Sequence, residues 1–170
     1  MFFFSPKLRV VFVCTANVCR SPLAEGILRH RLRCMGIGKK VQVSSAGTHV
    51  GQKGRCPDPR AEKIAAEAGV SLRGIRARSL TRRMIRHSDY LIVMERRHLH
   101  SIARLCPGEG LQNVHLLGSF LPLQDGEVTD IPDPYFGDWQ GFVDVYERLN
   151  MALSALLSEL ETDLEKGRFS

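Results

Sequence analysis

A chain of 170 residues is long enough for one domain with a proper hydrophobic core and short for two. Hydrophobic residues at 44% and charged residues at 25% are ordinary for a soluble globular protein. The formal net charge of +6 favours anionic partners. It does not by itself indicate nucleic acid, because a phosphate-binding enzyme also needs positive potential.

The cysteines and the first residues of the chain indicate a reducing compartment. The five cysteines are odd in number and irregularly spaced, so they do not form a secreted disulfide framework, and no Cys-x-x-Cys or His-x3-His pair suggests structural zinc. The opening MFFFSPK is too short for a signal peptide, and no run of about 18 apolar residues exists for a membrane helix. We expect a cytoplasmic protein with reduced thiols and no membrane contact.

Strands and helices alternate along the chain, which favours a parallel α/β sheet. In chain order we predict a strand at 8–13, a helix at 21–34, a strand at 41–43, a helix at 60–68, a helix at 81–87, a strand at 90–94, a helix at 96–105, a strand at 114–117 and a helix at 142–160. Ser21 is expected to cap the first helix, with Pro22 at its first position. With no internal repeat or linker, residues 1–170 form one domain, in which 1–7 is an N-terminal extension and 162–170 a mobile C-terminal tail.

The stretch from Val10 to Glu25 joins a buried strand to a helix N-terminus through a short loop, a geometry that points backbone N–H groups at an anion. The loop has the pattern Cys-x5-Arg-Ser, with Cys14 at its entrance and Arg20 at its exit. The thiolate is the reactive form of cysteine, and a helix N-terminus and a cation both favour it. The guanidinium fork of Arg20 suits two phosphate oxygens while Cys14 attacks phosphorus in line. The pattern therefore predicts covalent phosphoryl transfer.

A leaving oxygen needs a proton, so a general acid is expected elsewhere in the chain. The candidate is Asp133 in IPDPYFGDW, on a long loop between rigid prolines. A turn-forming aspartate before proline is the alternative interpretation of the same residue. Asp130 and Asp58 are rivals, although Asp58 has the position of a helix cap.

With these residues placed, the chain resembles the low-molecular-weight protein-tyrosine phosphatases, and in particular their bacterial members. VFVCTANVCRSPLAE matches the family signature near the N-terminus, and DPYFG matches its general-acid segment. Between them VSSAGT, DPRA, ARSLT and SDYLIVM fall in family order, so the resemblance covers nearly the whole chain. It implies a four-stranded parallel sheet with helices on both faces, and catalysis by Cys14, Arg20 and Asp133 without a metal or organic cofactor.

The resemblance also implies roles for the rest of the site. Asn17 holds the loop open, Ser21 stabilises the Cys14 thiolate, and Cys19 can form a reversible disulfide with Cys14. Tyr135 and Phe136 wall the pocket and suit a phenyl ring. The complete set of substrate-binding and phosphate-binding candidates is Thr15, Ala16, Asn17, Val18, Cys19, Ser21, Tyr135, Phe136 and His49. The implied partner is a phosphotyrosyl protein, for which a bacterial tyrosine autokinase is one candidate.

Three positions depart from the family pattern. Ala16 replaces a usual glycine, which would cost about 1 kcal/mol or more if the residue needs a positive φ. Ile75 replaces a histidine that tethers the Asn–Ser network, so a thinner network is expected. His49 is the one ring in the loop HVGQKGRC, where the family often supplies an aromatic wall.

Other functions remain open from the sequence. A phosphoarginine phosphatase resembles this chain but carries threonine at the position of Val18. A thiol-dependent arsenate reductase needs two further cysteines close together, and Cys56 and Cys106 lie far apart in the sequence. A non-catalytic phosphate-binding module could use the basic connector between Arg73 and Arg86 to dock an acidic or phosphorylated tail. That connector lacks the interleaved aromatic residues expected for nucleic-acid binding.

Overall fold

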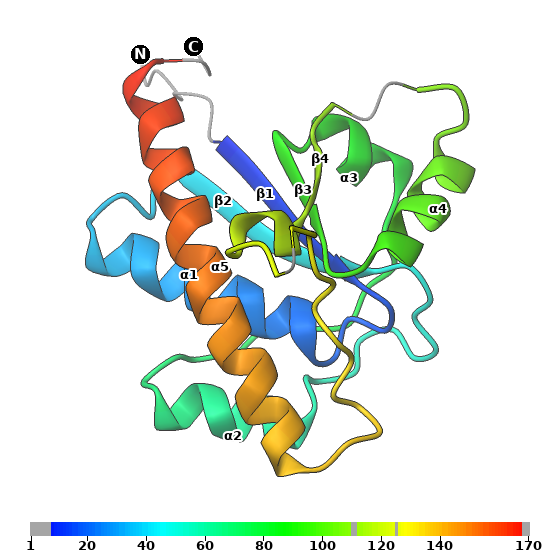
Figure 1. The fold of residues 1–170 in the computed structure, drawn as a ribbon, viewed down its shortest axis with the longest axis vertical. Helices are drawn as coiled ribbons and strands as arrows, with labels where there is room; N and C mark the ends of the chain where they lie inside the picture. Colours follow the sequence, from blue (N-terminus) through cyan, green and yellow to red (C-terminus); the bar gives the residue numbers. More distant parts are fainter. Residues whose placement is uncertain (1–7, 110–111, 125, 168–170) are drawn as a thin grey trace.

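In a computed structural model of the protein, residues 8–109, 112–124 and 126–167 are described. The elements are β1 (Leu8–Cys14), α1 (Arg20–Cys34), β2 (Val41–Gly47), α2 (Pro59–Glu67), α3 (Arg82–His87), β3 (Tyr90–Val93), α4 (Arg96–Leu105), β4 (Val114–Leu116), the 3-10 helix η1 (Leu117–Phe120) and α5 (Trp139–Glu165). The four strands form one parallel sheet in the order β2-β1-β3-β4 (Figure 1). The predicted fold class is confirmed.

The side chains of β1 divide between two hydrophobic clusters, one on each face of the sheet. Val10 and Phe12 pack into the cluster that holds the apolar residues of α1, α2 and α5. Val11 and Val13 pack into the smaller cluster with Ile85 of α3 and residues of α4. Successive strand residues point to opposite faces, and both faces are covered, which explains why the run from Val10 to Val13 is apolar throughout. Figure 1 shows α5 lying across α1 on one face, with α3 and α4 on the other.

Most element boundaries differ from the sequence prediction by one residue, β2 runs four residues longer than predicted, and α5 differs by several residues at both ends. Helix α5 begins earlier because Asp138 caps it by accepting a hydrogen bond from the backbone N–H of Gly141, and it continues to Glu165. The first residues of the expected C-terminal tail are therefore helical, while 168–170 and the extension 1–7 lie outside the described residues. Strand β4 ends one residue early because Leu117 enters η1. Helix α1 begins at Arg20.

The carboxyl ends of the central strands meet at one edge of the sheet, where parallel α/β folds bind ligands. Cys14 pairs with Gly47, and Val13 pairs with Val93, so the loops after β1, β2 and β3 share this edge. Gly47 lets the end of β2 lie close to the loop after β1, since a Cβ at this position would lie 2.6 Å from the carbonyl oxygen of Thr15. Among the described residues, no helix is both long and apolar enough to cross a bilayer.

Candidate active site

The loop between β1 and α1 presents its backbone N–H groups without protein acceptors. Its carbonyl oxygens instead bond outward: Cys14 accepts from the N–H of Thr48 at 2.9 Å, Thr15 from that of His49 at 2.9 Å, and Val18 from that of Asp58 at 2.8 Å. In the described part of the chain, none of the N–H groups of residues 15–19 has an acceptor. With α1 beginning directly behind it, the loop is a concave set of donors suited to an anion.

Asn17 adopts the left-handed conformation that closes this loop, with φ of 57°. It is the one non-glycine residue with a positive φ among those described, so Ala16 does not need the conformation that favours glycine. Asparagine tolerates this region better than most residues. The methyl group of Ala16 is therefore accommodated without backbone strain.

The side chain of Asn17 is held from both ends. Its amide nitrogen donates to Ser21 Oγ and to Ser45 Oγ, both at 2.9 Å, and its oxygen accepts from the backbone N–H of Arg78 at 3.0 Å. Ser45 in turn donates to the buried carboxylate of Glu25. Burial raises the pKa of Glu25. Replacing the family histidine by Ile75 thus leaves a continuous network, in which Ser45, Glu25 and the Arg78 backbone take part.

Ser21 does not cap α1 as predicted; the N-cap position is Cys19, which has no side-chain cap bond. The Ser21 hydroxyl is turned instead toward the nucleophile candidate, with Oγ 3.0 Å from Cys14 Sγ. Both side chains are buried. Burial also raises the pKa of the neighbouring Cys19 thiol, which keeps that group neutral.

Arg20 is 1% exposed and carries a partner on each side of its guanidinium group. Nη1 donates to the carboxylate of Glu95 and to the carbonyl oxygen of Ile131 at 2.8 Å, while Nη2 lies 2.7 Å from Asp133 Oδ2. Nε is buried without a hydrogen-bond partner among the described residues. A buried donor left unpaired is costly unless a ligand satisfies it.

Glu95 was not predicted from the sequence, although it follows β3 at the ligand-binding edge, and that position was the available signal. Burial acts to raise the pKa of its carboxyl group, but hydrogen bonds from Arg97 and Arg20 outweigh burial and lower it. Glu95 therefore stays ionised and fixes the Arg20 fork.

His98 links this carboxylate to the loop. Its Nδ1 accepts from the backbone N–H of Glu95 at 3.1 Å, and its Nε2 lies 3.0 Å from Thr15 Oγ1. Because Nδ1 is an acceptor, the proton lies on Nε2, which donates to Thr15. Burial, with the nearby Arg20 cation, lowers the pKa of His98 to about 4. A neutral imidazole thus ties α4 to the loop.

The segment that carries Asp133 is anchored by Arg60. The Arg60 guanidinium donates to the carbonyl oxygens of Tyr135 at 2.9 Å and Gly137 at 3.0 Å, and it pairs with Asp58. Asp58 also accepts from the Arg60 backbone N–H, so it is the helix cap that the sequence indicated. The remaining rival, Asp130, bonds the backbone N–H of Arg96 instead.

A hollow of about 310 Å³ opens above the loop. It is lined by Cys14, Thr15, Ala16, Val18, Cys19, Arg20, Gly51, Gln52, Arg55, Asp133, Tyr135 and Phe136. The rings of Tyr135 and Phe136 meet edge to face at 5.0 Å, and Phe136 is 95% exposed at the rim. Of the predicted candidates, Asn17 and Ser21 lie buried behind this lining, and His49 is exposed and is not part of it.

No cluster of three or more histidine, cysteine, aspartate or glutamate side chains suited to a metal occurs within the described ranges. The chemistry available in the hollow is that of a buried thiol, a guanidinium group, a carboxyl group and a ring of backbone donors. These are the groups needed for nucleophilic attack on a tetrahedral anion and for proton transfer to its leaving group.

Comparison with known proteins agrees with this arrangement. A model of the family described as low molecular weight phosphotyrosine protein phosphatase matches residues 9–166. A low molecular weight protein-tyrosine-phosphatase of Streptomyces coelicolor is 37% identical, with 92% of this chain and 96% of that protein covered. The structure of YfkJ from Bacillus subtilis matches with a TM-score of 0.84 and 26% identity, covering 92% of this chain and 96% of that one. The arginine phosphatase YwlE, solved as a cysteine-to-serine mutant with a phosphorylated active-site serine, matches with a TM-score of 0.81 and 26% identity, covering 91% and 97%.

Proposed function

Because the chain belongs to the low molecular weight phosphotyrosine protein phosphatase family, we propose that it hydrolyses phosphotyrosyl protein through a phosphocysteine formed on Cys14. The observation that carries the proposal is the donor set around Cys14. The N–H groups of residues 15–19 and Arg20 Nε have no acceptors within the described residues. Together they can bind the non-bridging oxygens of a phosphoryl group, where transition-state charge develops.

In the first step, the Cys14 thiolate attacks phosphorus as the bond to the tyrosyl oxygen breaks, and the Asp133 carboxyl group protonates that oxygen. Ser21 donates its hydroxyl hydrogen bond to the thiolate at the 3.0 Å contact. Asp133 lies 2.7 Å from Arg20 Nη2 at the mouth of the loop, within reach of a leaving oxygen. The products are free tyrosine hydroxyl and phosphocysteine.

In the second step, the Asp133 carboxylate accepts a proton from a water molecule as the water oxygen attacks phosphorus. The phosphorus–sulfur bond breaks, phosphate leaves, and the Cys14 thiolate is restored. The same donors stabilise both transition states because the phosphoryl oxygens keep their places. YwlE with its phosphorylated active-site serine supports a covalent intermediate in a protein of similar fold.

The walls of the hollow favour an aromatic phosphoester. Val18 is apolar, and the rings of Tyr135 and Phe136 stand at the rim, so a phenyl ring can pack between the Val18 side chain and this aromatic pair. The likeness to the arginine phosphatase YwlE favours phosphoarginine as a second candidate substrate. We expect phosphotyrosine to be preferred, since Val18 offers no polar atom to a guanidinium group.

The decisive experiment measures hydrolysis of p-nitrophenyl phosphate and of matched phosphotyrosyl and phosphoarginyl peptides. Activity without added metal, inhibition by vanadate and loss of turnover in Cys14→Ser are expected. Full activity in Cys14→Ser, or loss of activity with a chelator, would contradict the mechanism. A faster rate on the phosphoarginyl peptide would replace the substrate assignment while keeping Cys14 as nucleophile.

We also propose that the protein works in a reducing cytoplasm. All five cysteines are unpaired, including Cys14 and Cys19 in the same loop. Oxidation of this loop would remove the nucleophile. The partner we propose is a phosphotyrosyl protein, with a bacterial tyrosine autokinase as the candidate to assay first.

A further inference from the structure

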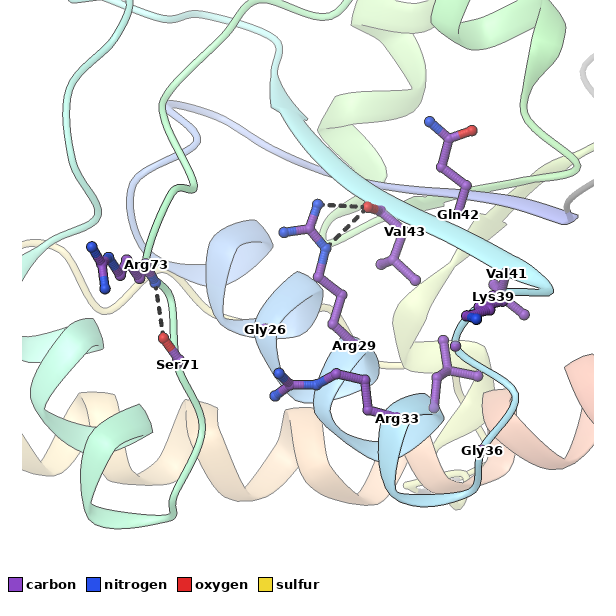
Figure 2. A pocket seen from close by; sticks show the side chains of 12 residues that line it. Gly26, Arg29, Arg33, Gly36, Lys39, Val41, Gln42, Val43, Ser71 and Arg73 are labelled. Atoms are coloured by element: carbon purple, nitrogen blue, oxygen red, sulfur yellow. Dashed lines mark hydrogen bonds between the residues drawn. The ribbon is translucent and has the colours of Figure 1, made fainter.

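A second hollow, of about 900 Å³, lies between α1, the start of β2 and the segment after α2. We name it the cationic groove, and its charged lining residues are Arg29, Arg33, Lys39 and Arg73. Figure 2 shows Arg29 and Arg33 projecting from the same helix between β2 and the segment that carries Ser71 and Arg73. The groove shares no lining residue with the hollow above Cys14, and it lies at the other end of β2.

The charge of this groove is not neutralised by the protein. Arg29 is paired with buried Glu25, and it also donates to the carbonyl oxygen of Val43 at 2.9 and 3.2 Å (Figure 2). In the described part of the chain, the side chains of Arg33, Lys39 and Arg73 have no carboxylate partner, and no carboxylate lines the groove. Three exposed cationic residues therefore line one hollow without a counter-ion from the protein.

The groove has an aliphatic floor. It is formed by Leu32, Val41 and Val43, which are buried and line the groove together with the exposed cationic residues. Gly26 brings the two walls together, because a Cβ at this position would lie 2.3 Å from Leu72 Cδ2. The close packing of α1 against residues 70–72 thus brings the segment that carries Ser71 and Arg73 to one wall of the groove, opposite the helix that carries Arg33 (Figure 2).

The lining points to a polypeptide. No aromatic side chain lines the groove, whereas single-stranded nucleic acids are held largely by stacking on aromatic rings. An aliphatic floor between cations instead complements a segment with an apolar residue flanked by carboxylates. Because Arg29 occupies the Val43 carbonyl, such a segment would be held through its side chains rather than as an added strand.

We propose that the cationic groove docks an acidic segment of a partner protein, independently of the Cys14 site. Carboxylates of the segment pair with Arg33, Lys39 and Arg73, and an apolar side chain covers the floor. The assignment extends the basic connector of the sequence analysis, since Arg73 belongs to it, while Arg33 and Lys39 come from a different part of the chain.

Fluorescence anisotropy with a labelled peptide of glutamate and leucine tests the proposal, and the same peptide with glutamine for glutamate is the control ligand. The acidic peptide is expected to bind the intact protein, with affinity falling as salt is raised from about 50 to about 300 mM. Arg33→Glu with Arg73→Glu is expected to weaken binding by about tenfold, because two attractive contacts become repulsive. Arg33→Gln with Arg73→Gln removes the charges without adding acid and should weaken it by about threefold.

The matched control is Arg104→Glu with Lys166→Glu, which changes the net charge equally at exposed positions outside the groove. Its affinity is expected to stay within about twofold of the parent protein. Equal loss in both variants would assign binding to net charge and overturn the proposal, as would no binding at low salt. If oligothymidylate binds more tightly than the acidic peptide, and Arg33→Glu with Arg73→Glu abolishes that binding, the groove binds nucleic acid and the proposal is overturned. Hydrolysis of p-nitrophenyl phosphate in each variant separates groove binding from the proposed catalysis.

Discussion

His98 makes the stability of this protein depend on pH in a predictable direction. Its pKa is about 4 in the folded protein and about 6.5 in an unfolded chain. When pH falls below 6.5, the unfolded chain takes up the proton first, so unfolding is favoured. The stabilisation is complete above pH 6.5, and it is lost progressively as pH falls toward 4.

The expected size of this loss follows from the two pKa values. Between pH 7.5 and pH 5.0, proton uptake at this one site lowers the free energy of unfolding by about 2 kcal/mol. His98→Gln cannot titrate in this range and can still donate to Thr15, so it should lack this component of the pH dependence. Other titrating groups, including buried Glu25, are common to both proteins and cancel in the comparison.

The assay is urea unfolding of both proteins at pH 7.5 and pH 5.0, followed by circular dichroism. The parent protein should lose about 2 kcal/mol more than His98→Gln between the two values. An equal loss in both proteins would refute the argument, because it would mean that the imidazole charges as readily folded as unfolded. A larger loss in His98→Gln than in the parent protein would mean that folding raises the pKa of His98 instead of lowering it.

Three further predictions concern the candidate active site. Asp133→Ala should lower kcat on the order of a hundredfold for phenyl phosphate but much less for p-nitrophenyl phosphate, whose leaving group needs no proton; a uniform loss would reject Asp133 as the acid. Glu95→Gln should lower kcat by about tenfold with a smaller change in KM, because Arg20 loses the ionic partner that aims its fork; unchanged kinetics would show that Asp133 and the Ile131 carbonyl suffice. Arg60→Ala should lower kcat/KM by about tenfold by releasing the carbonyl oxygens of Tyr135 and Gly137. Its control is Lys63→Ala, which removes a cation over the Trp139 ring without touching those carbonyls, and an equal effect of both changes would indicate a general loss of packing around α5.

The Cys14–Arg20 loop was accessible to sequence analysis because its parts are adjacent in the chain. An apolar strand, a short loop and a helix start define a donor-lined turn whatever lies around it, so Cys14 and Arg20 could be placed before the fold was known. The conformation within the loop was harder to predict. Ala16 was the residue in doubt, yet Asn17 carries the positive φ, because closure of the loop depends on bonds to Ser45 and Arg78.

The helix N-termini likewise divide into those set by neighbouring residues and those set by contacts with distant parts of the chain. Asp58 caps α2 as predicted, and Thr81, which was predicted as the first residue of its helix, caps α3; each bonds a backbone N–H within three residues of itself. Ser21 has the same residue chemistry but is not a cap. Its hydroxyl lies between Asn17 and Cys14, and those contacts replace the local cap.

The sequence by itself determined the α/β architecture and the Cys14–Arg20 loop, because each rests on periodicity or on a short local pattern, whereas the preference for Asp133 over Asp130 and Asp58 rested on the resemblance of DPYFG to a family segment. Only the tertiary structure decided how Arg20 is held. Glu95 lies 75 residues from Arg20 in the chain, and Asp133 lies 113 residues away. These groups meet because parallel strands deliver their following loops to one sheet edge, and pairing among ionised groups depends on that proximity and on burial, which no local pattern specifies.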